Sequence, residues 1–305
     1  MKVVILERNK LVGRKVARLF AATGANATSI EEPAALAPTA HDADVVCADS
    51  FDGELVAELV RARPGVRGVL WTAEPLRRSL KYLAEAPGIA HVLARRDFES
   101  PPRAWEVVMV ARRLATPAAP PLAAYLDWGA SRWELDVRTT ADRDRAVARI
   151  QELVGGLVVP RRIGELFGEL AHELIMNAMY DAPVDERGHP RYAADRKRPI
   201  ALDEHERPLV WLGSDGTRLA LQVRDPFGRL ERRHVVEGLA RGFAGEMDHS
   251  HGGAGLGMLL CHNASSALFF DVVRGHSTEV TAVFELDLNL REFRTQARSL
   301  HLWSP

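Results

Sequence analysis

The feature that most constrains the fold is a regular alternation of short apolar runs and amphipathic segments over residues 1 to about 117. The apolar runs have the length of buried strands, and the amphipathic segments carry apolar residues at the three- and four-residue steps of a helix. Five strands that alternate with five helices predict a parallel sheet with helices on both faces. The predicted strands are 3–6, 27–30, 45–47, 68–71 and 91–93, and the helical stretches include 11–22, 55–63, 77–84 and 102–114.

Function in a parallel sheet of this kind gathers at the carboxyl ends of its strands. Here those ends carry Glu7 followed by Arg8, and then Asp49, Thr72 and Arg95. The set resembles the receiver domain of bacterial response regulators over the whole of this segment. In that family an acidic pair, a phosphoacceptor aspartate, a threonine or serine, and a lysine follow strands one, three, four and five. The resemblance places Asp49 at the phosphoacceptor position and Thr72 at that of the switch hydroxyl.

Two arginines depart from the receiver pattern. Arg8 replaces one acid of the pair that binds Mg²⁺, and Arg95 stands where lysine is expected. A cation at the metal position opposes Mg²⁺ binding, and arginine does not substitute freely for a lysine that contacts a phosphoryl group. We therefore expect a pseudo-receiver that is not phosphorylated, in which Arg8 forms a bidentate pair with Asp49 where Mg²⁺ would bind. Such a module would serve for docking or dimerisation, and we expect a homodimer.

The composition of the whole chain restricts its partners and its location. With 305 residues, 47% of them hydrophobic, the chain is long enough for two domains with cores of their own. Its 41 acidic and 40 basic residues nearly cancel, so nothing suggests a nucleic-acid partner. Cys47 and Cys261 lie in apolar runs, as buried thiols do. No signal peptide is evident, and no apolar run reaches the roughly 18 residues of a membrane span, so we expect a cytoplasmic protein without a membrane partner.

A stretch rich in proline and alanine at 116–122 marks the join between two patterned regions. We therefore divide the chain into a receiver-like domain at 1–117, a linker at 118–127 and a second domain at 128–305. The polar stretch 184–207 is interpreted as a solvated loop or hairpin. The remaining patterns of the second domain predict strands at 133–137, 208–213, 217–224, 268–273 and 279–286, and helices from about 140 to 153, from 160 to about 181, up to 264, and from 290 to 300.

The helix predicted up to residue 181 carries two polar residues on an otherwise apolar face. Glu173 and Asn177 are four residues apart, so their side chains emerge on the same face, one turn apart. Burying a carboxylate and a carboxamide there is costly unless something uses them. Asn177 offers a neutral oxygen to a hard cation such as Mg²⁺, and Glu173 could orient or deprotonate an attacking hydroxyl.

A glycine-rich stretch, His251-Gly-Gly-Ala-Gly-Leu-Gly-Met258, opens the predicted helix that runs to residue 264. Glycines at this position allow backbone N–H groups to approach an anion, and the helix N-terminus adds its dipole. The same pattern can also be a tight turn that packs closely, so by itself it is a weak signal.

Taken together, these elements resemble the GHKL superfamily of ATPases, to which histidine kinases belong. The family order is an N-box helix, an aspartate-bearing glycine box, a lid, a GxGLG box and a late threonine. This chain has Glu173 and Asn177, then Asp225, then the glycines at 253–257, then Thr278. The resemblance covers about residues 133–288 and implies an α/β sandwich, with a mixed sheet and helices on one face. The chain is most similar to the anti-sigma-factor serine kinases, because no dimerisation hairpin precedes the N-box helix.

The resemblance also implies the role of each residue at an ATP site with Mg²⁺. Asn177 would ligate the metal, with Asp181 close to the nucleotide, and Glu173 would be the general base. Asp225 would accept a hydrogen bond from the adenine amine, with help from Thr278. The phosphates would bind at Gly253, Gly255, Leu256 and Gly257. The first glycine box departs from the family, since Phe227 and Arg229 replace its usual glycines, and Gly228 would supply the turn.

Two functions follow from this resemblance. The first is ATP-dependent phosphoryl transfer to serine or threonine of a regulatory protein, such as an anti-anti-sigma-like protein or a sigma factor. The second is a non-catalytic module in which bound nucleotide switches protein partners, and the degenerate receiver and the altered glycine box favour it. A histidine kinase is excluded because no acceptor hairpin is evident. His172 is interpreted as an ordinary helix residue, because no N-box follows it.

Overall fold

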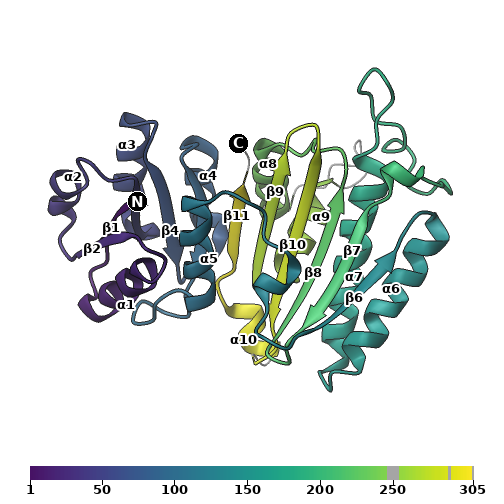
Figure 1. Ribbon diagram of the computed structural model, residues 1–305, viewed down its shortest axis with the longest axis horizontal. Helices are drawn as coiled ribbons and strands as arrows, with labels where there is room; N and C mark the ends of the chain where they lie inside the picture. The colour runs from purple at the N-terminus through teal and green to yellow at the C-terminus, as the bar shows by residue number, and fades with distance from the viewer. Residues whose placement is uncertain (246–253, 288–289, 304–305) are drawn as a thin grey trace. The chain divides into compact units, whose positions relative to one another are not determined.

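The computed structural model describes residues 1–245, 254–287 and 290–303. The chain separates into two compact units (Figure 1). The first unit contains Met1–Ala119 together with Arg291–Leu302, and the second contains Pro120–Leu290. In the described part of the chain, no helix has both the length and the apolar character needed to cross a membrane.

The first unit is built on a parallel sheet with the strand order β2-β1-β3-β4-β5. Every pairing among these five strands is parallel, which confirms the fold predicted from the alternating pattern. The order is that of flavodoxin-like doubly wound sheets. The strands are β1 (Lys2–Leu6), β2 (Asn26–Ile30), β3 (Val45–Asp49), β4 (Arg67–Thr72) and β5 (Ile89–Ala94).

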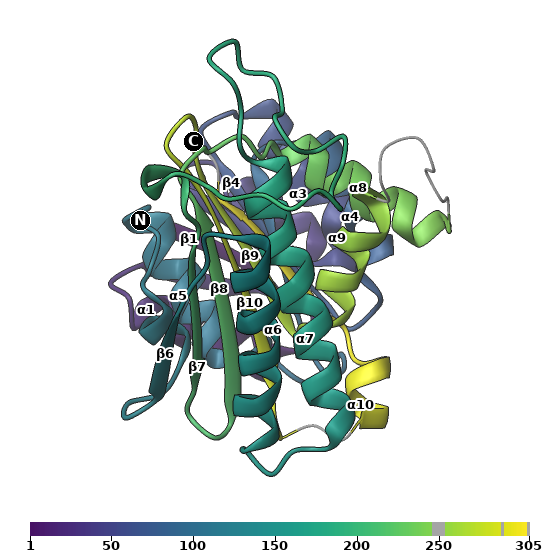
Figure 2. The same cartoon turned by 90° about the vertical axis from the view of Figure 1, so that its right-hand side faces the viewer.

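Helices cover both faces of this sheet. Figure 2 shows α1 and α5 on one side of the strands and α3 and α4 on the other. The side chain of Asn9 caps α1 by accepting from the amides of Leu11 and Val12. The helices are α1 (Lys10–Ala21), α2 (Leu36–Thr39), α3 (Gly53–Ala62), α4 (Leu80–Glu85) and α5 (Ala104–Ala115).

The end of the chain differs from the prediction. The terminal helix expected at 290–300 is only α10 (Leu290–Thr295), and β11 (Ser299–Trp303) follows it. Strand β11 pairs antiparallel with β5 through Leu300 and His301, so it extends the sheet of the first unit. The pairing buries His301 against Glu106 of α5, with 2.7 Å between Nε2 and Oε1. A pairing between residues about 200 positions apart leaves no local signal in the sequence.

The sheet of the second unit has the order β9-β10-β8-β7-β6, and every pairing among these strands is antiparallel. The expectation of a mixed sheet was therefore wrong. The physical reason is that short turns join β7 to β8 and β9 to β10, and hairpins can only connect antiparallel strands. The strands are β6 (Ser131–Asp136), β7 (Leu209–Ser214), β8 (Arg218–Asp225), β9 (Ala267–Val273) and β10 (Ser277–Glu285).

Four helices lie on one face of this antiparallel sheet, as Figure 2 shows. They are α6 (Thr140–Gly155), α7 (Arg161–Met176), α8 (Arg232–Ala244) and α9 (Ala254–Asn263). Thr139 begins α6 with a capping box, in which its side chain and that of Asp142 each accept from the other's backbone amide.

Two segments, predicted as a linker and as a solvated loop or hairpin, are packed against the second unit. In the predicted linker, Leu122–Tyr125 forms a 3₁₀ helix, and a side chain added at Gly213 of β7 would collide with Leu126, the residue that follows this helix. The polar segment 184–207, expected to be a solvated loop, buries Ile200 and Leu202. Its backbone also bonds to the start of α6, where Thr140 N donates to Ile200 O at 3.1 Å. Apolar residues within both polar stretches give them partners that composition alone did not reveal.

Candidate functional site

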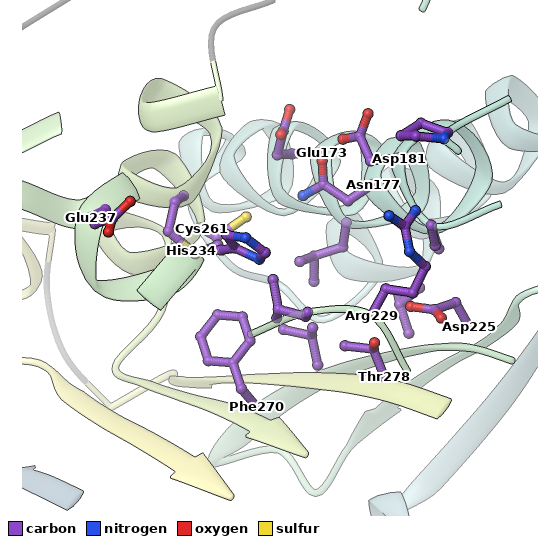
Figure 3. Close-up of a pocket in the computed structure, with 18 of the residues that line it drawn as sticks. Glu173, Asn177, Asp181, Asp225, Arg229, His234, Glu237, Cys261, Phe270 and Thr278 are labelled. Atoms are coloured by element: carbon purple, nitrogen blue, oxygen red, sulfur yellow. The ribbon is translucent and has the colours of Figure 1, made fainter. Parts of the chain in front are cut away.

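A cavity of about 370 Å³ lies in the second unit between the sheet and its helices (Figure 3). Its walls come from α7, α8 and α9, and its floor comes from β8, β9 and β10. The cavity is lined by five of the residues selected from the sequence: Glu173, Asn177, Asp181, Asp225 and Thr278. The structure thus brings together residues that are separated by up to about a hundred positions in the chain.

A π-helical turn brings the side chain of Asp181 to the cavity. Helix α7 is continued by a π turn at Asn177–Asp181, in which Ala182 N donates to Asn177 O across five residues at 3.0 Å. In a regular α-helix, the eight residues from Glu173 to Asp181 would leave their side chains rotated by roughly 80° from each other. The wider turn takes up part of this rotation, so that Asp181 joins Glu173 and Asn177 at the cavity. Such π turns are frequent at functional sites.

The guanidinium of Arg196 contacts the side chains of Glu173, Asn177 and Asp181. Its Nη2 atom lies 2.8 Å from Asn177 Oδ1, 3.3 Å from Asp181 Oδ2 and 3.6 Å from Glu173 Oε1. Arg196 comes from the polar segment 184–207, and its side chain is 20% exposed. The sequence did not predict this contact, because Arg196 lies outside any helix or strand, and an irregular segment has no periodicity from which the direction of a side chain can be predicted.

The electrostatic environment of Asp181 follows from its neighbours. Partial burial raises the pKa of the Asp181 carboxyl to about 6, and the negative charge of Glu173 acts in the same direction. The guanidinium of Arg196 opposes this rise, because it favours the charged carboxylate. The pair of acids is therefore costly to ionise together without a cation between them.

Asp225 and Thr278 lie on the floor of the cavity, directly opposite each other on neighbouring strands. Asp225 is buried, and burial raises the pKa of its carboxyl, although hydrogen bonds from Phe227 N, Gly228 N and Thr278 oppose the rise. Its Oδ1 atom accepts from Phe227 N at 2.9 Å, so the carboxylate also fixes the turn that ends β8. Around it the floor is apolar, formed by Val223, Phe270 and Val280.

Other walls of the cavity carry side chains that the sequence did not assign to the nucleotide site. Arg229 lines the cavity, and Figure 3 shows its guanidinium reaching from the strand floor towards the helix that carries Asn177. His234, Glu237 and Arg241 line the cavity from α8, at the spacing of one helix face. Cys261 of α9 also faces it; this thiol is free and buried, and burial raises its pKa.

The residues expected at the phosphates lie in different surroundings. Gly253 lies outside the described residues, Gly255 lies in the first turn of α9, and Leu256 beside it is 45% exposed. Gly257 lies close to α7, because an added side chain would come within 2.0 Å of Glu173 Oε1. Gly228 does not line this cavity: it has φ = +61°, and its Cα faces the turn between β9 and β10, where a side chain would come within 2.1 Å of Val273 O.

A second polar cluster lies at the carboxyl ends of β1, β3 and β5 in the first unit. There Arg95 bridges two acids, with 3.0 Å from Nη1 to Glu7 Oε2 and 2.6 Å from Nη2 to Asp49 Oδ2. The predicted pair between Arg8 and Asp49 was wrong. Arg8 instead forms a bidentate pair with Asp52, at 2.6 and 3.0 Å. The arginine that pairs with Asp49 is Arg95, which directly follows the last parallel strand.

The side chains of Thr72 and Asp49 also accept hydrogen bonds from backbone amides two residues further along the chain. Thr72 is buried, and its hydroxyl accepts from Glu74 N at 2.9 Å. Asp49 Oδ1 accepts from Phe51 N at 2.8 Å. Burial raises the pKa of the Asp49 carboxyl, while the Phe51 amide and Arg95 oppose this. The cluster therefore forms a closed network of ion pairs and hydrogen bonds.

No known family model matches the chain, and no curated protein matches it significantly. Among the solved structures that match part of the chain are three with a TM-score of 0.32 each. A response regulator receiver domain protein from Clostridium thermocellum is 13% identical and covers 38% of this chain and 94% of its own. A pilus assembly-related protein from Burkholderia pseudomallei is 18% identical, with coverage of 39% and 92%. The receiver domain of the Francisella response regulator 1452 is 14% identical, with coverage of 38% and 97%. Because these TM-scores are low, the description of the first unit as receiver-like rests on its own strand order.

Proposed function

We propose that the second unit binds an adenine nucleotide, and that the bound nucleotide controls which regulatory protein the chain engages. One observation carries this proposal. Three segments far apart in the chain, at 173–181, 225 and 278, meet at one cavity, and they are the segments that the resemblance to GHKL ATPases selects. The cavity volume of about 370 Å³ lies within the range of small-molecule sites.

The floor of the cavity suits an adenine ring. Val223, Phe270 and Val280 offer apolar contact to a flat base, and the buried carboxylate of Asp225 offers an acceptor for its exocyclic amine. Guanine presents a carbonyl at the corresponding position, which would leave this carboxylate facing another acceptor. A buried acceptor without a donor costs about 1–3 kcal/mol, so we expect ATP to bind in preference to GTP.

The upper wall of the cavity suits the phosphates. Glu173, Asn177 and Asp181 present oxygen atoms, the ligands that Mg²⁺ takes in proteins, so the donor chemistry fits a nucleotide-bound metal. When bound, Mg²⁺ would neutralise the charge of the phosphates. Arg229 and Arg241 add positive charge on the other walls. Arg196, however, already holds the oxygen atoms of the first three residues.

The position of Arg196 also favours a binding module over an enzyme. Glu173 Oε1 lies 3.6 Å from this guanidinium, so the carboxylate that would have to contact the nucleophile already has a partner. We therefore place partner switching first, with an anti-anti-sigma-like protein or a sigma factor as the class of partner. Phosphoryl transfer to serine or threonine, with Glu173 as the base, is the second candidate, because the carboxylate does face the cavity.

Calorimetric titration of the full chain with ATP, with and without Mg²⁺, tests the proposal. The full chain is needed because Arg291–Leu302 belongs to the first unit. We expect ATP to bind and GTP to bind more weakly. Folded protein that gives no heat with ATP under either condition would show that the cavity is not a nucleotide site. Incubation with radiolabelled ATP and candidate partners, in single-turnover conditions, separates the kinase from the switch.

A further inference from the structure

The second unit carries a cation of its own where the proposed nucleotide would bring Mg²⁺. The guanidinium of Arg196 lies within 2.8–3.6 Å of oxygen atoms of Glu173, Asn177 and Asp181. We infer that Arg196 and a divalent cation exclude each other at these oxygens, so that Arg196 must withdraw before the site can accept Mg²⁺. The inference concerns the regulation of this site and rests on the proposed function.

The exclusion follows from the chemistry of the shared ligands. A divalent cation needs the same oxygen lone pairs that accept hydrogen bonds from, or pair with, the guanidinium. The side chains of Glu173 and Arg196 are only 18% and 20% exposed, so water screens the charges there less than at the surface. Two cations held a few ångströms apart in such a place repel each other strongly. One position therefore takes either the arginine or the metal.

The turn that carries the acids also holds the segment that carries the cation. Tyr180 lies in the π turn between Asn177 and Asp181, and its hydroxyl donates to Arg198 O at 2.7 Å. Before Arg196 in the chain, Arg191 pairs with Glu206 at 2.6 Å. The segment 184–207 is thus bonded to the π turn next to Arg196 and cross-linked within itself, which keeps the guanidinium at a high effective concentration over the acids.

The pairing is nevertheless weak enough to exchange. The side chain of Asp181 is 41% exposed, and ion pairs of partly exposed groups contribute little to stability. The phosphates of a nucleotide would offer the guanidinium a new anionic partner as it leaves the acids. Because Pro190 of the same segment lines the cavity, withdrawal of Arg196 would also alter the surface around its mouth. A protein partner that binds this surface would then distinguish the nucleotide-bound chain from the nucleotide-free chain.

The inference is tested by titrating the full chain with Mn²⁺ alone and measuring free Mn²⁺ by electron paramagnetic resonance. Arg196→Gln removes the cation and retains a polar side chain of similar length. We expect this variant to bind Mn²⁺ at least about tenfold more tightly than the wild type, which corresponds to about 1.4 kcal/mol. Equal or weaker binding by Arg196→Gln would overturn the inference.

Arg198→Gln is the matched control. It removes the same charge two positions along the segment, from an exposed side chain that has no partner among the described residues. We expect its Mn²⁺ binding to equal that of the wild type. A gain as large as that of Arg196→Gln would mean that net charge, and not competition for these oxygens, controls the metal. If Arg196→Gln does not fold, Arg196→Met serves instead, since methionine also removes the charge and keeps an unbranched side chain; a similar gain is expected, and no gain would overturn the inference.

Nucleotide titrations separate this inference from the proposed function. Weaker ATP binding by Arg196→Gln with Mg²⁺ present, together with unchanged Mn²⁺ binding, would identify Arg196 as a phosphate ligand only and overturn the exclusion. If Arg196→Gln gains Mn²⁺ binding while neither protein binds ATP, the proposed nucleotide function is wrong and the exclusion stands. Tighter binding of both ATP·Mg²⁺ and Mn²⁺ by Arg196→Gln would support both.

Discussion

Arg95 offers the sharpest test of how the first unit is held together. Its side chain is 2% exposed and lies between Glu7 and Asp49, whose side chains are 4% and 11% exposed. Arg95→Met keeps much of the volume but leaves two carboxylates without their shared cation. Removing one partner of a buried pair costs about 3–5 kcal/mol. We expect the lower end, about 3 kcal/mol, because Glu7 keeps its hydrogen bond from Trp71 Nε1 and Asp49 keeps that from Phe51 N.

The loss of unfolding free energy in Arg95→Met should increase as the pH rises. Burial already raises the pKa of Asp49 in the folded protein, and removal of Arg95 would raise it further. A raised pKa means that the folded state favours the protonated carboxyl. Its stabilising effect is therefore complete below the unfolded pKa of about 4 and disappears as pH rises through the folded pKa. The difference between Arg95→Met and the wild type should thus be large at pH 7.5 and smaller at pH 4.5.

Urea unfolding followed by circular dichroism and tryptophan fluorescence, at both pH values, measures this difference. Arg96→Met is the matched control, because the Arg96 side chain is 85% exposed, and we expect it to change the unfolding free energy by less than about 0.5 kcal/mol. A loss below about 1 kcal/mol for Arg95→Met at pH 7.5, or the same loss at both pH values, would refute the reasoning.

Three further predictions concern the two sites. Asp49 should gain no phosphoryl group from acetyl phosphate and Mg²⁺, because Arg95 occupies its carboxylate; a mass increase that Asp49→Asn abolishes would show a working receiver. Asp225→Asn should weaken ATP binding about 10- to 150-fold, the loss of one hydrogen bond to a charged group, while Asp144→Asn on the exposed side of α6 should bind in calorimetry as the wild type does. Glu173→Ala should retain ATP binding but lose any hydrolysis or transfer, since a base acts on the nucleophile and hardly on the bound nucleotide. Equal loss of binding in Glu173→Ala and Asn177→Ala would contradict that division of roles.

The sequence by itself determined the elements whose signals are local. Apolar runs that alternate with helical patterns predicted the five parallel strands of the first unit, because burial on both faces requires continuous apolar strands. Helix starts and hairpin turns are local too, so the start of α6 at about residue 140 and the hairpin of β7 and β8 could be placed from the sequence. The spacing of Glu173 and Asn177 likewise predicted that both face one side of α7, and both line the cavity.

Only the tertiary structure decided which charges meet. The choice between Arg8 and Arg95 as partner of Asp49 depends on where parallel strands end relative to each other, which side-chain pattern does not encode. Arg196 reaches the acids of α7 through the path of an irregular segment, and irregular segments lack the periodicity from which direction can be predicted. The joining of β11 to β5 is a pairing across the whole chain. Local patterns fix which residues are buried and in which element, whereas contacts between distant polar residues depend on the packing of complete elements.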